Sequence, residues 1–321
     1  MKAIVYRQYG SPDVLELQDV PKPVPKDHEA LVRVRAASVN PLDWHVLRGM
    51  PYIVRATAGW RTPKRHIPGV DVAGIVEAVG ANVTDLKPGD EVYGEKSRAC
   101  AEYVCGPATL FVPKPVNLTM DEAAAVPVGA ATALQALRDK GRIQPGQTVL
   151  INGASGGVGT FTVQLAKAFG AVVTGVCSTP NVDLVRSLGA DRVIDYTRDD
   201  FTRGSARYDL IIDNAGNHSM LAMRRVLKPT GSVVLVGAPK GNWIAPLLRI
   251  FGSQVLSRFG DRKLTWHLTD ITREDLLYLT QLIEAGTLKP VVDRRYPLSE
   301  VPEAIRYLET MRAKAKVVIT V

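Results

Sequence analysis

The sequence predicts an α/β fold in which a β-rich domain accompanies a doubly wound parallel sheet. Short β-rich runs fill residues 1–120, strands alternate with helices over 121–261, and this alternation stops in 262–321. Strands that alternate with helices are typical of a parallel sheet covered on both faces. Because residues 262–321 do not continue the alternation, we expect them to return to the first domain.

Length and composition agree with two domains. The chain has 321 residues, of which 46% are hydrophobic and 22% charged, enough for about two domains with separate cores. Three cysteines are too few for a disulfide framework, which favours a reducing compartment. The start MKAIVYRQYG lacks the features of a secretory signal, so we expect a cytoplasmic protein.

Two other functional classes are disfavoured. The most apolar stretch, residues 123–137, is shorter than the roughly 20 residues of a membrane span, and we interpret it as a buried helix. The net charge of +8 comes from 40 basic and 32 acidic residues that are scattered along the chain. Without a basic run, we expect no nucleic-acid partner.

The β-rich domain is predicted from runs such as ALVRVRAASV and GIVEAVG, separated by the turn-forming segments PKPVPKDHE, LKPGDEV and VPKPVNL. This pattern is typical of an antiparallel, barrel-like domain. Near the other end, Leu276, Leu279 and Ile283 recur at helical spacing, and KVVITV forms a closing strand.

The middle of the chain contains the alternation of strands and helices. Expected strands are 148–152, 172–177, 192–196, 208–214 and 232–237, and expected helices are 157–170, 182–190 and 220–227.

A glycine-rich loop, INGASGGVGTF at 151–161, connects the first of these strands to the first helix. The unpaired amides of a helix N-terminus bind anions, and glycines let a pyrophosphate approach the backbone. Gly159 is expected to allow close packing of helix on strand. The candidate dinucleotide site is Ala154, Ser155, Gly156, Gly157, Val158 and Gly159.

The tip of the second strand predicts which dinucleotide binds. NAD enzymes place an acid there, roughly 20 residues past the glycines, to accept the ribose hydroxyls. This chain has Ser178 at that position, with Thr179 and Asn181 as further neutral groups. NADPH is therefore favoured. Tyr196 either approaches the same pocket or packs at the end of its strand.

Further motifs carry a family resemblance. They are SVNPLDWHVLRG (38–49), PGVDVAGIVEAVG (68–80), LKPGDEVYG (86–94), GASGGVG (153–159), LGADRVIDY (188–196) and KVVITV (316–321). Over nearly its full length the chain resembles the zinc-free branch of the medium-chain dehydrogenase/reductase superfamily, close to the quinone oxidoreductase and zeta-crystallin-like group. The resemblance implies a GroES-like catalytic domain made from both chain ends and an inserted Rossmann domain, with NADPH in the cleft between them. Relatives often carry an arginine where this chain has Pro180.

The same resemblance implies that no metal is bound. Zinc-dependent relatives carry a catalytic cysteine where this chain has Asn40, and Gly-His-Glu where it has Gly69, Val70 and Asp71. Of their four-cysteine structural zinc lobe, only Cys100 and Cys105 fall in the corresponding region.

Loss of the metal favours conjugated acceptors. Hydride added to an enone or a quinone leaves a delocalised anion. Hydrogen-bond donors can stabilise this anion, although they do so less strongly than a Lewis acid such as zinc. We therefore expect NADPH-dependent reduction of quinones or of the activated C=C bond of α,β-unsaturated carbonyl compounds. Two alternatives are an NADPH-binding sensor or structural protein of negligible turnover, and a zinc-free alcohol or carbonyl oxidoreductase.

Catalytic candidates lie in residues 38–52. Related quinone reductases carry a tyrosine in place of His45 and a second one near Tyr52. His45 is expected either to orient a carbonyl or donate a proton, or to be a buried structural histidine. Asn40 is expected to anchor the substrate or the nicotinamide edge, and Asp43 to hold the turn.

The family pattern implies further cofactor contacts, at Thr132, Asn214, Ala215, Gly237 and Ala238. Lys316 either reaches an acidic phosphate or faces solvent, and we favour solvent. Residues 50–66 and 239–269 form either an apolar substrate pocket or a partner-facing patch; they contain Trp60, Trp243, Leu247, Leu248, Ile250, Phe251, Phe259 and Trp266. Whether the chain forms a homodimer is left open.

Overall fold

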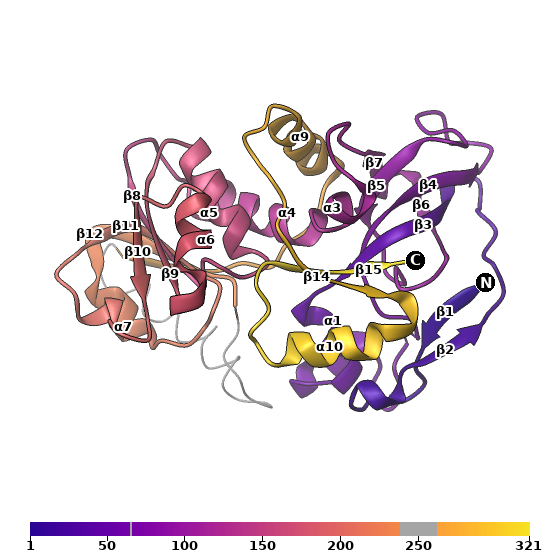
Figure 1. Ribbon diagram of the computed structural model, residues 1–321, viewed down its shortest axis with the longest axis horizontal. Helices are drawn as coiled ribbons and strands as arrows, with labels where there is room; N and C mark the ends of the chain where they lie inside the picture. The colour runs from indigo at the N-terminus through magenta and orange to yellow at the C-terminus, as the bar shows by residue number, and fades with distance from the viewer. Residues whose placement is uncertain (65, 238–261) are drawn as a thin grey trace. The chain divides into compact units, whose positions relative to one another are not determined.

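The computed structural model describes residues 1–64, 66–237 and 262–321, which fall into two compact units (Figure 1). Unit 1 contains Met1–Val128 and Ile271–Val321, and unit 2 contains Gly129–Asp270. Both ends of the chain therefore belong to unit 1.

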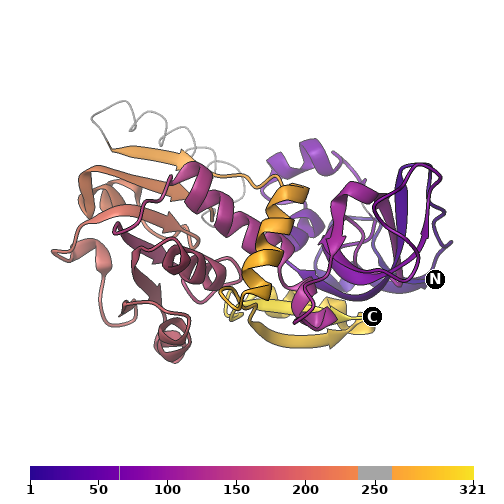
Figure 2. The ribbon, with the colours of Figure 1, turned by 90° about the horizontal axis from the view of Figure 1, so that it is seen from above.

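Unit 1 is built on a seven-stranded sheet of order β14-β15-β3-β4-β5-β7, in which β6 also pairs with β3. Its strands are β3 (Glu29–Val39), β4 (Asp71–Val79), β5 (Glu91–Glu95), β6 (Tyr103–Pro107), β7 (Phe111–Pro113), β14 (Val292–Pro297) and β15 (Lys316–Thr320). All pairs are antiparallel except β14 with β15. β1 (Lys2–Val5) and β2 (Glu16–Asp19) form a separate antiparallel ribbon. In Figure 2 the C-terminal strands lie against the first strands of this unit, as the pairing of β15 with β3 requires.

The helices of unit 1 cover a core formed by both ends of the chain. They are α1 (Pro41–Arg48), α2 (Arg55–Ala58), α3 (Met120–Ala124), α9 (Arg273–Glu284) and α10 (Val301–Glu309). The core joins Val34 and Val72 from the first part with Ile305 and Ile319 from the last. In α9 the predicted apolar face is confirmed, because Leu276, Leu279 and Ile283 are all buried.

Unit 2 is a six-stranded parallel sheet of order β10-β9-β8-β11-β12-β13. Its strands are β8 (Thr148–Asn152), β9 (Val172–Cys177), β10 (Arg192–Asp195), β11 (Tyr208–Asp213), β12 (Leu227–Leu235) and β13 (Lys263–Trp266). Helix α4 (Pro127–Gln135) precedes these strands in the chain, and helices α5 (Gly159–Ala168), α6 (Val182–Ser187) and α7 (Met220–Arg225) lie between them. This parallel α/β architecture confirms the predicted fold class.

Helices cover both faces of this sheet. A Cβ on Gly175 of β9 would lie 2.5 Å from Val185 of α6, whereas the neighbouring residue, Val176, shares a core cluster with Met223 of α7. Successive residues of a strand point to opposite faces, so α6 and α7 pack on opposite sides.

Several element boundaries differ from the predicted ones; β12, for example, begins at Leu227 rather than at 232. The four residues of β13 pair in parallel with β12, so part of the expected return segment belongs to unit 2. A strand this short shows no periodicity of its own. The expected single helix at 123–137 is instead divided between α3 and α4, because Pro127 starts a new helix, as proline at a first helical position favours. Among the helices that the structure describes, none has the length and apolarity to cross a membrane.

Candidate functional site

The glycine loop follows β8 at the carboxyl edge of the unit 2 sheet. Gly153 has a φ of +78°, and Gly159 begins α5. A Cβ at Gly159 would lie 2.0 Å from the carbonyl oxygen of Gly153, so only glycine fits there. Because position 159 is a glycine, the start of α5 can lie directly against the loop backbone. The first amides of the helix are then placed where they can bind an anion.

Asn214 is the clearest indication of a missing ligand at this edge. It follows β11, and both polar atoms of its side-chain amide are buried without a hydrogen-bond partner among the residues that the structure describes. Buried amides are nearly always paired, so a polar group that is absent from the protein chain fits here. A Cβ on Gly153 would lie 3.5 Å from Ala215, and one on Gly237 would lie 2.1 Å from the carbonyl oxygen of Asn214. The structure thus gathers these predicted residues at one edge; Ala238 lies outside the described residues.

The ends of β9 and β10 form a second polar group. The side-chain nitrogen of Asn181 donates to the hydroxyls of Ser155 at 3.1 Å and Ser178 at 3.2 Å. Its Oδ1 is buried without a hydrogen-bond partner in the described part of the chain and can accept from a hydroxyl. Tyr196 joins this group, since its amide donates to the Cys177 carbonyl, and its side chain is 55% exposed. Such exposure does not fit the alternative of packing at the strand end.

Sequence reasoning missed a histidine in unit 2. Thr132 is buried, and its hydroxyl lies 2.7 Å from that of Thr269, which is 3.2 Å from Nε2 of His267. Burial lowers the pKa of His267 to about 4, and within residues 1–64, 66–237 and 262–321 its buried Nδ1 has no hydrogen-bond partner. The signal that would have found it is a lone histidine directly after the strand KLTW.

A buried ionic cluster lies in unit 1 around Asn40 and Asp71. The Lys316 ammonium is 2.6 Å from Oδ1 of Asn40 and 2.8 Å from Oδ2 of Asp71. The Asn40 amide and the Ser38 hydroxyl donate to the same Asp71 oxygen, at 2.9 and 2.6 Å. These contacts fix the orientation of the Asn40 side-chain amide, because its oxygen must face the ammonium, which only donates, and its nitrogen must face the carboxylate, which accepts.

Lys316 is therefore a correction to the sequence analysis. We expected this side chain to face solvent, but only 3% of it is exposed. The reason is its position at the start of β15, which lies beside β3 within the sheet and brings the lysine to the acid at the start of β4.

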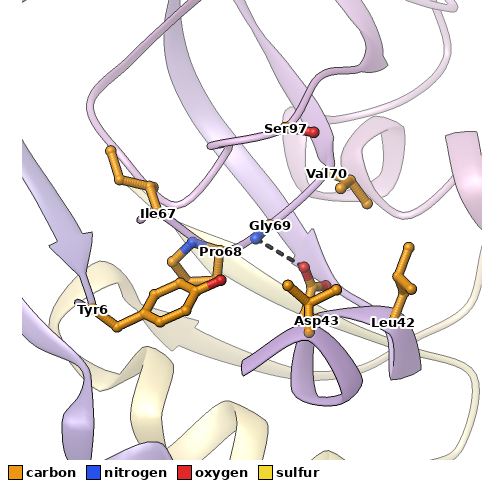
Figure 3. A pocket seen from close by; sticks show the side chains of 9 residues that line it. Tyr6, Leu42, Asp43, Ile67, Pro68, Gly69, Val70 and Ser97 are labelled. Carbon is orange, nitrogen blue, oxygen red and sulfur yellow. Dashed lines mark hydrogen bonds between the residues drawn. The ribbon is translucent and has the colours of Figure 1, made fainter. Parts of the chain in front are cut away.

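Asp43 holds the start of α1. Its carboxylate accepts from the backbone amides of Asn40 at 2.7 Å and Gly69 at 2.9 Å. Burial, assisted by the charge of Asp71, raises the pKa of Asp43 to about 6 despite these hydrogen bonds. Figure 3 shows the Asp43 to Gly69 bond at the side of a small, mostly apolar pocket, lined also by Tyr6, Leu42, Val46, Ile67, Pro68, Val70 and Ser97. The geometry agrees with a structural role for Asp43.

His45 has a defined tautomer. Its Nδ1 is 2.8 Å from the carbonyl oxygen of Met50, and because a carbonyl only accepts, Nδ1 carries the proton. In the neutral ring Nε2 is then an acceptor. Burial lowers the pKa of His45, and the ring stacks on Trp44 with centroids 3.6 Å apart. The only N–H of a neutral His45 thus points to the Met50 carbonyl oxygen. The neutral ring therefore does not fit the expected role of orienting a substrate carbonyl by donating a hydrogen bond to it.

Tyr52 follows the end of α1 and opens a short helical turn, Tyr52–Val54. The Arg55 guanidinium lies over the rings of Tyr52 and Tyr9, at 4.9 and 4.5 Å, and its Nε donates to the carbonyl oxygen of Gly49. His45 and Tyr52 are thus both anchored to the turn that ends α1. Asn40 occupies the N-cap position at the opposite end of α1, about 12 Å further back along the helix axis.

The described residues contain no group of three or more His, Cys, Asp or Glu side chains that could hold a metal ion. Cys100, Cys105 and Cys177 are free thiols. Burial raises the pKa of Cys105 to about 11, with Glu29 adding to the shift.

Two known protein families match the chain. Residues 26–130 match the family described as alcohol dehydrogenase GroES-like domain, and 188–319 match the one described as zinc-binding dehydrogenase. The chain is 37% identical to 2-methylene-furan-3-one reductase from Solanum lycopersicum, over 99% of this chain and 79% of that protein. It is 36% identical, with the same coverage, to the chloroplastic NADPH-dependent alkenal/one oxidoreductase of Arabidopsis thaliana. The solved quinone oxidoreductase from Coxiella burnetii superposes with a TM-score of 0.87 at 31% identity, covering 100% of this chain and 99% of that one.

Proposed function

The chain belongs to the quinone oxidoreductase-like branch of the medium-chain dehydrogenase/reductase superfamily, and from this premise we propose that it uses NADPH to reduce quinones or the activated C=C bond of enones. The related proteins are named for reduction of a furanone, of alkenals and alkenones, and of quinones. These substrates share a carbonyl conjugated to the bond that accepts hydride.

The observation that carries the proposal is the cluster of Lys316, Asp71 and Asn40. The ammonium lies within 2.8 Å of both partners, and the family resemblance implies that Asn40 stands where zinc-dependent relatives have a cysteine ligand. A divalent cation would have to displace an internal cation, and neither an amide nor a lysine is a typical zinc ligand. The donor set thus supports chemistry without a Lewis acid, for which a conjugated acceptor is the better substrate.

The residues of unit 2 fit a nicotinamide dinucleotide. The first amides of α5 would hold its pyrophosphate, and the unpaired Oδ1 of Asn181 would accept from a ribose hydroxyl. The unpaired amide of Asn214 would bind polar atoms towards the nicotinamide end. When bound, the cofactor supplies a hydride. We propose NADPH over NADH because Ser178 stands where an acid would accept both ribose hydroxyls.

The tautomer of His45 indicates different roles for His45 and Tyr52 in substrate binding. We propose that the Tyr52 phenol donates to the substrate oxygen as negative charge develops there, because a phenol always carries a donor. His45 accepts a hydrogen bond at Nε2 and orients a hydroxyl or water. Asn40 then acts mainly by capping α1 and holding the Lys316 cluster.

The proposal is tested by mixing the protein with NADPH and a panel of quinones, 2-alkenals and aryl enones while following NADPH absorbance. NADPH deuterated at C4 is expected to leave its label at the β-carbon of an enone product. A label at a carbinol carbon would show carbonyl reduction instead. No turnover with any acceptor would favour a sensor or structural role.

Location and assembly remain predictions of the sequence. We propose a cytoplasmic protein with a small-molecule substrate and no nucleic-acid partner, although the relative from Arabidopsis thaliana is named as chloroplastic. Whether two copies form a homodimer is a question for sedimentation or light scattering.

A further inference from the structure

An aspartate lies beside the predicted ribose-binding residues of unit 2. Asp195 ends β10 and pairs in register with Cys177, the last residue of β9. The Thr179 hydroxyl donates to Oδ2 of Asp195 at 2.6 Å. The amide and hydroxyl of Thr197 donate to Oδ1 at 3.0 and 2.8 Å. An acid is thus present at this edge, supplied by the third strand of the unit rather than the second.

The partners of Asp195 decide what this acid can do. Oδ1 accepts two hydrogen bonds and Oδ2 one, which leaves about one of the roughly four acceptor sites of a carboxylate and so too few to accept from both ribose hydroxyls. These donors also lower the pKa of Asp195, with Thr179 the largest cause, and the group is ionised at neutral pH. Its uncompensated charge would repel a 2′-phosphate.

Arg198 supplies the compensating charge. Its Nε is 3.6 Å from Oδ2 of Asp195, the same oxygen that Thr179 contacts. The arginine side chain is 75% exposed, whereas that of Asp195 is 12% exposed. A guanidinium has five N–H donors in a planar fork, which matches the oxygens of a phosphate. A ligand bound near Thr179 would therefore lie close to the Arg198 guanidinium, which has N–H donors beyond the one that faces Asp195.

We propose that Arg198 binds the 2′-phosphate of NADPH and sets the preference of this protein for NADPH over NADH. The inference rests on the proposed function in taking NADPH as the cofactor. Relatives often place an arginine at the position of Pro180, and Arg198 supplies the cation from the adjacent strand end instead. Ser178 and Thr179 contribute hydroxyls to the same phosphate, and Asp195 positions the guanidinium.

Arg198→Ala tests the proposal by binding alone. Calorimetric titrations would use NADPH, NADH, adenosine 2′,5′-bisphosphate and AMP, since the last two differ only in the 2′-phosphate. We expect the variant to raise the Kd of both 2′-phosphorylated ligands about tenfold, as loss of a charge-assisted contact does. The Kd values of NADH and AMP are expected to stay within twofold. Arg198→Lys should retain part of the discrimination.

Arg203→Ala is the matched control. Arg203 is also exposed and also forms an ion pair with the aspartate three residues before it, at 3.2 Å from Asp200. It should leave all four Kd values within twofold. In the wild type, the Kd of the bisphosphate should rise more steeply with salt than that of AMP, and Arg198→Ala should remove this difference.

Three outcomes would overturn the proposal. They are an equal change for phosphorylated and unphosphorylated ligands, no change in Arg198→Ala, or a wild type that does not distinguish the bisphosphate from AMP. A protein that binds NADPH through Arg198 yet reduces no acceptor would contradict the proposed function and leave this inference intact.

Discussion

Replacing Lys316 with methionine removes an ammonium group from the interior of unit 1 while keeping a side chain of similar length. The ammonium is 2.8 Å from Asp71, whose side chain is 0% exposed. In the variant that carboxylate keeps its hydrogen bonds from Ser38, Asn40 and the amide of Val128. It loses the only positive charge that the structure places on it within the described residues.

The expected loss follows from burial of the pair. Removing one partner of a buried ion pair costs about 3–5 kcal/mol, because the other charge stays buried without compensation. The three remaining donors to Asp71 place the expected value near the lower end, about 3 kcal/mol. For a unit of this size, that corresponds to a fall in Tm of roughly 6–12 °C.

The assay is calorimetry at pH 7 on the wild type, Lys316→Met, Asp71→Asn and the double variant. Because the protein has two units, the Tm of each resolved transition is compared rather than a single free energy of unfolding. The double variant contains neither charge, so it should be at least about 2 kcal/mol more stable than the sum of the two single losses predicts. Lys314→Met, which changes an exposed lysine two residues earlier, should leave the Tm unchanged.

Two results would refute this reasoning. One is a Lys316→Met protein with a Tm within about 2 °C of the wild type, which corresponds to less than about 1 kcal/mol. The other is strict additivity in the double variant, which would show that the lysine and the aspartate do not interact energetically.

Four further predictions concern the site. Tyr52→Phe should lower kcat about 100- to 1000-fold with little change in NADPH affinity, whereas His45→Phe should lower kcat less, because Nε2 of His45 only accepts a hydrogen bond. Steady-state kinetics with parallel titrations of NADPH would check both variants. Equal kcat values for Tyr52→Phe and the wild type would exclude the phenol as the donor. Ser178→Asp should move preference towards NADH, and fluorescence titration that finds the same ratio of Kd values would contradict this. Elemental analysis should find no stoichiometric zinc, and a chelator should leave activity unchanged; about one zinc per chain would show that ligands other than the family's are used. Because the pKa of Asp43 is raised to about 6 in the folded protein, folding favours the protonated carboxyl, and the contribution of Asp43 to stability falls by up to about 3 kcal/mol as pH rises from about 4 to about 6. Urea titrations should therefore show the wild type gaining stability relative to Asp43→Asn on acidification from pH 7 to 4.5. A difference in stability that stays constant with pH would contradict the raised pKa.

The sequence by itself determined what depends on local spacing. The alternation of strands and helices predicted the parallel sheet of unit 2, and the glycines at 153–159 predicted a tight loop at a helix N-terminus. Side-chain periodicity predicted the buried face of α9. These features are readable because a helix or strand imposes its period on nearby residues.

The tertiary structure alone decided which polar groups meet. Lys316 and Asn40 are 276 positions apart in the chain, yet their side chains lie 2.6 Å from each other, and no local pattern distinguishes a buried lysine from an exposed one. The tautomer of His45 depends on a carbonyl that the turn after α1 brings to its ring, and Thr179 meets the Asp195 oxygen beside Arg198 only through the pairing of β9 with β10. Such contacts depend on how strands register in the folded sheet, because hydrogen bonds and ion pairs act between neighbours in space rather than in sequence.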